Sequence, residues 1–260
     1  MAHPGSSRIL AHCGRAFGRS LLALGLGGLL ACGGGGGGGS TQTAPPPPPA
    51  ADISGIWTAT TGGITYHALV LPGTLAFRTL DSNVLEGSGT FTLSGATLGG
   101  SILVFPSAPY LAAGYPKQTG TVSGTASSTA LTVTIAIPLG SFTNNLVLDS
   151  AASIPVQLAD LAGTYTAAAG ANTSSGLGGT FTLDAAGNLT GSDPGGTLQG
   201  TLTAAAAGLN AFHATFTYTP GTGSPQTYSG LAYLLPGSPV QVVLMTDNGA
   251  LEFSGYFQKQ

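Results

Sequence analysis

The chain has 260 residues but only six cationic and nine acidic side chains, and its formal net charge is −3 at pH 7. Nucleic-acid binding requires clustered lysines and arginines, so this composition argues against it. With so few charges, the surface must be built from Thr, Ser, Gly, Gln and Asn, which is compatible with an extracellular or periplasmic protein.

The first residues predict a targeting segment. Arg8, Arg15 and Arg19 give it a basic front, and an apolar run follows at residues 21–30. A membrane-spanning helix needs about 20 apolar residues, whereas the apolar region of a secretory signal needs about 7–15. The run is therefore too short to span a bilayer and predicts a signal peptide.

The apolar run ends in Leu-Leu-Ala-Cys at residues 29–32, which resembles the lipobox of bacterial lipoprotein precursors. This resemblance implies that the chain is cut before Cys32 and that the Cys32 sulfur carries a lipid, with palmitate as a typical acyl chain. In that family an aspartate after the cysteine favours the inner membrane, so Gly33 implies an outer-membrane anchor. The alternative is an ordinary signal peptide followed by a chance cysteine.

A run of glycines and a run of prolines follow Cys32 and predict a disordered tether over residues 32–51. Polyglycine forms a flexible coil and polyproline a stiff extended spacer, and neither buries enough apolar surface to fold. Acyl chains on Cys32 would hold the tether in a bilayer, and two or more chains make such anchoring stable. Cleavage would remove Cys13, so no disulfide could form within the mature chain.

From Asp52 onward apolar and polar residues alternate, which is typical of half-buried antiparallel strands. Leu131, Val133 and Ile135, for example, share one face of a run whose other face carries threonine and alanine. Turn signals of the Pro-Gly and Asn-Gly kind separate the runs. Strands are predicted near residues 53–60, 64–71, 74–80, 86–94, 101–105, 119–126, 131–137 and 146–149, and near 161–167, 179–183, 189–191, 197–204, 212–219, 227–235, 240–246 and 251–258.

The second half of the chain repeats the first. DISGIWTAT at residues 52–60 matches DLAGTYTAA at residues 160–168, and GTFT at 89–92 matches GTLT at 200–203. The order of the matches is kept and their offset changes by only a few residues. Duplication with small loop insertions produces this pattern.

These patterns predict an all-β protein with two tandem antiparallel, up-and-down, eight-stranded β-barrel-like domains after a disordered Gly/Pro tether. Closing each meander into a barrel leaves no free edge, and one larger β-sandwich built from both halves is the alternative. Transmembrane barrels are disfavoured, because the face opposite the large apolar residues carries mostly Thr, Ser and Gly. The predicted division is a signal peptide at 1–31, lipidated Cys32 and linker at 32–51, barrel 1 at 52–149, a linker at 150–159 and barrel 2 at 160–260.

A second resemblance lies in the overall plan and the end of the sequence. A lipidated cysteine, a polyglycine leash and eight-stranded barrels are similar to surface lipoproteins of the transferrin-binding and factor-H-binding type. Gly255, Phe257 and Lys259 match the Gly-x-Phe stretch and basic residue with which their last strand often closes. Those families are richer in Lys and Glu, so the resemblance implies architecture and not a particular partner.

The sequence predicts no enzyme, no cofactor and no metal site. No Gly-x-Ser-x-Gly nucleophile motif or phosphate-binding loop is found. Of the histidines, only His67 and His213 follow the signal, and neither has His, Asp or Glu at metal-ligand spacing. We expect a packed His67 and a solvated His213, and nothing selects His67 as a haem ligand.

Several residues correspond between the halves. Trp57 and Tyr165 share a first-strand position and are expected to plug the barrel cores, with a ligand platform as the alternative. Asp52 and Asp160 also correspond and are expected to form turns rather than calcium sites. In the second half, the alternation sends seven aromatic residues inward and predicts a packed core: Tyr165, Phe181, Phe212, Phe216, Tyr218, Phe253 and Phe257.

The expected function is that of a lipid-anchored bacterial envelope protein, on the periplasmic face or at the cell surface. A surface binding or adhesion module is favoured, because rigid barrels present loops to a host or envelope protein or glycan. A structural or assembly lipoprotein without a diffusible ligand is the alternative. A carrier of haem or a lipophile ranks below both, and the ligand-binding residues stay unassigned.

Overall fold

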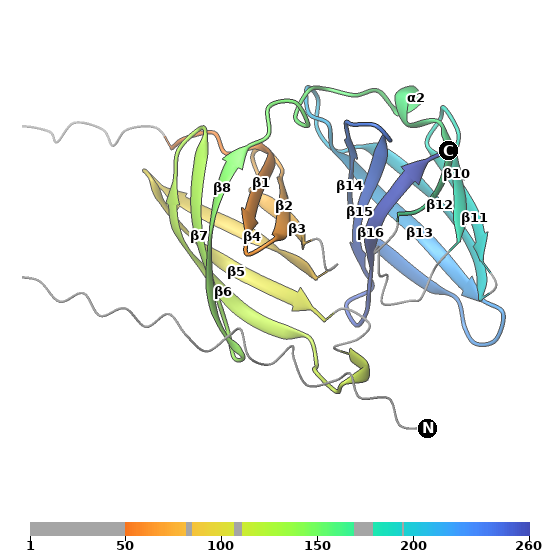
Figure 1. Ribbon diagram of the computed structural model, residues 1–260, viewed down its shortest axis with the longest axis horizontal. Helices are drawn as coiled ribbons and strands as arrows, with labels where there is room; N and C mark the ends of the chain where they lie inside the picture. The colour runs from red at the N-terminus through yellow and green to blue at the C-terminus, as the bar shows by residue number, and fades with distance from the viewer. Residues whose placement is uncertain (1–49, 82–84, 107–110, 169–178, 194) are drawn as a thin grey trace, which may run out of the picture. The chain divides into compact units, whose positions relative to one another are not determined.

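The computed structural model describes residues 50–81, 85–106, 111–168, 179–193 and 195–260 (Figure 1). Residues 46–260 form one compact unit. Nearly all regular structure in the described part is β, arranged as two closed antiparallel barrels. The prediction of two tandem eight-stranded domains is confirmed, and the single β-sandwich is excluded.

The first barrel is an up-and-down meander in which each strand pairs with the next along the chain. It closes where its first strand pairs with its eighth, with Trp57 opposite Leu148. Its strands are β1 (Gly55–Thr61), β2 (Ile64–Val70), β3 (Ala76–Asp81), β4 (Glu86–Ser94), β5 (Thr97–Phe105), β6 (Gln118–Ala126), β7 (Ala130–Ile137) and β8 (Gly140–Leu148).

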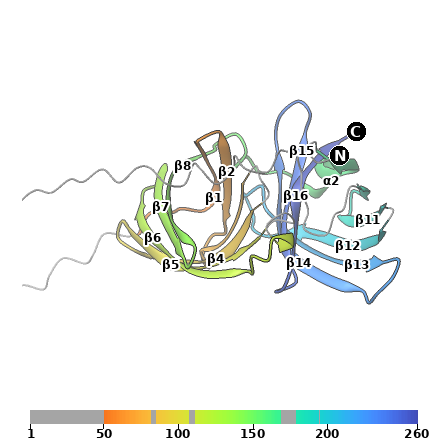
Figure 2. The same cartoon turned by 60° about the horizontal axis from the view of Figure 1, so that its bottom comes forward.

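The second barrel repeats this topology and closes where its last strand pairs with its first, with Lys259 opposite Tyr165. Figure 2 shows the two barrels from a second direction. The strands are β9 (Gly163–Ala167), β10 (Thr180–Leu183), β11 (Asn188–Asp193), β12 (Gly196–Ala204), β13 (Phe212–Pro220), β14 (Gln226–Leu235), β15 (Gln241–Asp247) and β16 (Glu252–Lys259).

The observed strands differ from the predicted ones mainly where glycine, serine and asparagine interrupt the alternation. β5 begins at Thr97 and β8 at Gly140, several residues earlier than predicted, because barrel pairing recruits weak strand formers. Leu161, predicted to begin a strand, instead ends a four-residue helix, α2 (Leu158–Leu161).

Large aromatic rings inside the barrels lie over glycines of the neighbouring strand. Phe216 of β13 is paired with Gly200 of β12, and Phe181 of β10 with Gly191 of β11. A methyl group on Gly191 would come within 2.8 Å of the Phe181 Cβ atom. Glycine is therefore required at such positions to leave room for the ring.

A third apolar cluster joins the barrels. It combines residues on the outer faces of β1–β3 with residues on the outer faces of β14 and β15. Ala152, in the segment predicted to be a linker, is fully buried in it. The barrels are thus packed against each other over a shared core of Ile56, Leu69, Leu71, Leu80, Ala152, Ala211, Leu231, Tyr233, Val243 and Met245.

The remaining outer walls carry cross-strand pairs of hydroxyl side chains. Thr134 and Thr143 face each other with their Oγ1 atoms 2.8 Å apart, and Thr217 and Thr227 do so at 3.2 Å. Opposed threonines stabilise antiparallel strands through such contacts. Hydroxyl groups thus supply much of the exposed polarity on these walls.

Candidate functional site

The interior of the second barrel is filled by aromatic rings. Phe216 stacks on Tyr228 with ring centroids 5.6 Å apart and meets Phe253 edge-on at 4.7 Å. Of the seven aromatic side chains predicted to point inward, six are buried and Tyr218 is partly buried against them. The predicted aromatic core of this barrel is confirmed.

The first barrel carries a smaller side chain at two matching positions, although at two others, Phe91 against Leu202 and Trp57 against Tyr165, it carries the larger one. Ile102 lies opposite Gly89 as Phe216 lies opposite the matching Gly200. Leu146 takes the place of Phe257. Leu146 lies two residues before Leu148, which pairs with Trp57, and Phe257 lies two residues before Lys259, which pairs with Tyr165. Two phenyl rings are thus replaced by shorter aliphatic chains in the first barrel, whose interior contains a cavity.

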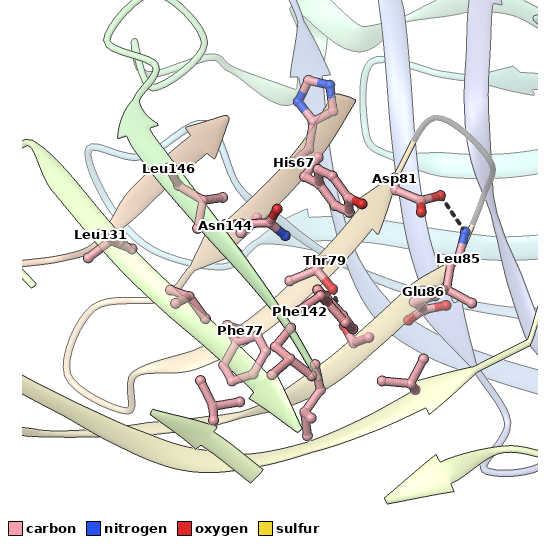
Figure 3. A pocket seen from close by; sticks show the side chains of 18 of the residues that line it. His67, Phe77, Thr79, Asp81, Leu85, Glu86, Leu131, Phe142, Asn144 and Leu146 are labelled. Atoms are coloured by element: carbon pink, nitrogen blue, oxygen red, sulfur yellow. Dashed lines mark hydrogen bonds between the residues drawn. The ribbon is translucent and has the colours of Figure 1, made fainter. Parts of the chain in front are cut away.

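This space is a narrow, mostly apolar cavity (Figure 3). The gaps between the lining side chains, mouth included, amount to about 650 Å³, but the part wide enough for a water-sized sphere is about 50 Å³. By that measure it holds roughly four water-sized groups in its present form. Its apolar wall includes Phe77, Phe91, Ile102, Val104, Val122, Leu131, Val133, Ile135, Phe142 and Leu146.

Asn144 of β8 places a side-chain amide among these apolar groups. Figure 3 shows it pointing into the space beside Leu146. It is 6% exposed, and its amide makes no hydrogen bond within the described part of the chain. A polar group that faces a cavity without a protein partner normally holds a water or a ligand.

Tyr66, Thr79 and Asp81 add polarity to the same cavity. Tyr66 and Asp81 are directly opposed on β2 and β3, and Asp81 Oδ1 accepts a 2.9 Å hydrogen bond from the Leu85 amide. Burial, and secondarily the Asp81 charge, raise the pKa of Tyr66. The phenol therefore stays protonated at neutral pH and can donate a hydrogen bond.

A charged cluster lies between the barrels and reaches the cavity at Glu86, which also lines it. Arg78 of β3 donates to Glu86 of β4 at 2.5 Å and also to Asp247 of β15 in the second barrel. Ser254 of β16 donates to Glu86, and Glu252 accepts a 3.2 Å hydrogen bond from the Glu86 amide. One arginine is therefore surrounded by carboxylates from both barrels.

The two glutamates of this cluster are fully buried. Burial raises the pKa of Glu86 to about 7, although the Arg78 charge and hydrogen bonds oppose the shift. Burial and the neighbouring Glu86 charge raise the pKa of Glu252 to about 10. Glu252 therefore carries a proton at neutral pH, and Arg78 is paired with Glu86 and Asp247.

His67 also belongs to the interface between the barrels. Its ring lies 5.7 Å from that of Tyr256 and 6.2 Å from that of Tyr233, measured between centroids. Burial lowers the pKa of His67, with Asp149 acting in the opposite direction. His67 is also among the residues that line the cavity, but Figure 3 shows its ring pointing away from the other labelled side chains, and it is a packed, neutral side chain.

The paired first-strand aromatics make the same contact in both barrels. Trp57 Nε1 donates to the Ile53 carbonyl at 2.9 Å, and the Tyr165 hydroxyl donates to the Leu161 carbonyl at 2.6 Å. Each is fully buried within the core of its own barrel. These contacts support the core-plug interpretation over a ligand platform.

The other predicted residues lie apart from the cavity. Asp52 accepts hydrogen bonds from the Ser54 amide and hydroxyl, as in a turn. Asp160, also expected to form a turn, instead lies in helix α2 and accepts a hydrogen bond from the Gln157 amide at the start of that helix. His213 is exposed on β13. Cys32 and its tether lie outside the described residues.

Sequence analysis did not single out Arg78, Glu86, Asn144, Asp247 or Glu252. A signal for the interface was present, because residues 230–235 and 242–245 are apolar on both strand faces. Strands that read as continuous apolar runs are covered on both sides. The cavity was visible only as a difference in side-chain size between the two repeats.

No family model, curated protein or solved structure matches this chain. Among the residues that the structure describes, no group of three or more His, Cys, Asp or Glu side chains could hold a metal ion. No helix in that part of the chain is long and apolar enough to cross a bilayer. The cavity and the interface between the barrels are the features of the described chain that bear on its function.

Proposed function

We propose that this protein is a lipid-anchored protein of the bacterial envelope that binds a small ligand inside its first barrel. The observation that carries the proposal is the difference between two barrels of the same topology. Aromatic rings fill one interior, whereas the other keeps a cavity into which an unpartnered amide points. Small-molecule sites are typically apolar cavities with a few placed polar groups.

The anchor is part of this proposal. The lipobox-like residues 29–32 and the glycine and proline runs that follow support lipidation of Cys32. Labelling cells with an alkyne-bearing fatty acid should mark the wild type and not Cys32→Ala. Equal labelling of both forms would overturn the lipid anchor but would leave the cavity argument intact.

The binding step has its own test. Full-length protein isolated from membranes should release a small molecule on solvent extraction, detected by mass spectrometry in near-stoichiometric amount. Val133→Phe projects a ring into the cavity and should abolish this release. Thr134→Val, on the outer face of the same strand, should not. Release that Val133→Phe leaves unchanged would overturn the proposal.

A second candidate is binding of a macromolecule on the outer surface. An open groove of about 420 Å³ lies between the barrels and is lined by Arg78, Ser88, His213, Thr215 and Ser229, among others. Together with the hydroxyl-bearing walls, it would suit a neutral, hydrogen-bonding partner such as a glycan. Protease shaving of intact cells, followed by glycan-array binding, tests this candidate. Protection from protease would instead favour a structural role inside the envelope.

A further inference from the structure

We infer that the first barrel takes a slender, unbranched apolar molecule that ends in a neutral hydroxyl or amide group. This inference rests on the proposed binding function and names the chemistry of its ligand. Three features of the cavity carry it: its small volume, its unpartnered amide and the Asp81 carboxylate that also lines it.

Narrowness sets the shape of the ligand. Only about 50 Å³ of the cavity admits a water-sized sphere. The space therefore suits a chain of about four to six non-hydrogen atoms better than a fused ring. Val122, Val133 and Ile135 contribute aliphatic groups along its length.

Asn144 sets the requirement for a polar head group. The residue is 94% buried, and its amide points into the cavity and has no hydrogen-bond partner in the described structure. An amide side chain offers both donors and an acceptor. A ligand hydroxyl or amide group can therefore donate a hydrogen bond to the Asn144 oxygen or accept one from its nitrogen. An entirely apolar ligand would leave the Asn144 amide without a hydrogen-bond partner, which lowers the binding affinity.

Asp81 and Tyr66 set the charge of that head group. Asp81 accepts hydrogen bonds and, as a carboxylate, repels a second carboxylate brought into a site of low dielectric. Tyr66 is directly opposite Asp81 in the strand register and presents a protonated hydroxyl. A fatty acid is thereby disfavoured relative to an alcohol of the same length.

Methyl-resolved NMR of residues 46–260, which form one compact unit with their own cores, tests the inference with three probes. These are 1-pentanol, 1-chloropentane and pentanoate. Pentanol should shift the methyl signals of Val122, Val133 and Ile135 saturably, while those of Val242 and Leu244 in the second barrel stay in place. Chloropentane and pentanoate should each bind at least fivefold more weakly.

Two variants separate the head group from the cavity. Asn144→Leu should remove the preference for pentanol over chloropentane, and Val133→Phe should abolish binding of all three probes. Equal binding of all three probes to the wild type would overturn the head-group inference and leave the proposed binding function standing. Absence of saturable shifts with every probe would overturn both.

Discussion

Replacement of Glu252 by glutamine should remove most of the pH dependence of stability above neutral pH. Glu252 is fully buried at the interface between the barrels, where burial and the Glu86 charge raise its pKa to about 10 from 4.5. Between these two values the folded chain holds a proton that the unfolded chain has lost. The contribution of Glu252 to the free energy of unfolding is therefore largest below the pKa of the unfolded chain. It decreases as the pH rises from that value towards the pKa of the folded chain.

The magnitude follows from the linkage relation. When the folded chain holds one proton that the unfolded chain has lost, the free energy of unfolding falls by ~1.4 kcal/mol for each unit by which the pH rises. From about pH 7.5 to about pH 9 the loss is therefore about 2 kcal/mol for the wild type. Glu86, whose folded pKa is about 7, adds its own decrease mainly below this interval. The interval thus isolates Glu252.

Denaturant titrations of residues 46–260 at a series of pH values measure the slope directly. Glu252→Gln keeps an acceptor for the Glu86 amide and should give a nearly flat profile across this interval. Asp184→Asn, which changes an exposed carboxylate in the turn before β11, should keep the wild-type slope. A wild type without a slope, or a slope that Glu252→Gln preserves, would refute the assignment of a raised pKa to this residue.

Three further changes test the packing. Phe216→Ala should lower the free energy of unfolding by about 3–5 kcal/mol as a large core truncation, and a loss below about 1 kcal/mol would contradict the packed core. Gly200→Ala should destabilise the chain strongly, because the added methyl group would collide with Phe216. Gly221→Ala is the control, because its methyl group would meet nothing closer than 3.6 Å. Equal stabilities of the two variants would contradict the packing of the ring over the glycine. Arg78→Met should cost about 3–5 kcal/mol near pH 7.5 by leaving buried carboxylates without their cation. That cost should be smaller near pH 5, where Glu86 is protonated, and a cost independent of pH would argue against the charge pairing.

The barrels could be predicted because their code is local. Each strand alternates apolar and polar residues, and the turn residues set the strand ends, so Leu131, Val133 and Ile135 were placed correctly inside. The strand ends that were missed, at Thr97 and Gly140, lie in stretches whose own preference for β structure is weak. In these stretches, pairing with the neighbouring strands determines where the strand begins, and the local sequence does not show which strands will be its neighbours.

The interface and the cavity could not be predicted for a different reason. Alternation assigns Glu252 and Ser254 to the outer face of β16, which an isolated barrel would expose to water. They are buried because the other barrel covers that face. Asn144 likewise looks like an ordinary polar residue of a weak strand until the register places it inward. Both features depend on contacts between segments far apart in sequence.

The pairing of Arg78 with Asp247 also constrains the order in which the protein can be assembled. These residues are separated by 169 positions, and the strands that cover the outer face of the first barrel, β14–β16, are synthesised well after that barrel. Until they arrive, Ile56, Leu69 and Leu80 form an uncovered apolar patch beside an arginine and a glutamate. A nascent chain that has completed only its first barrel therefore exposes an aggregation-prone apolar surface. Export in an unfolded form would postpone that exposure until both barrels can fold together.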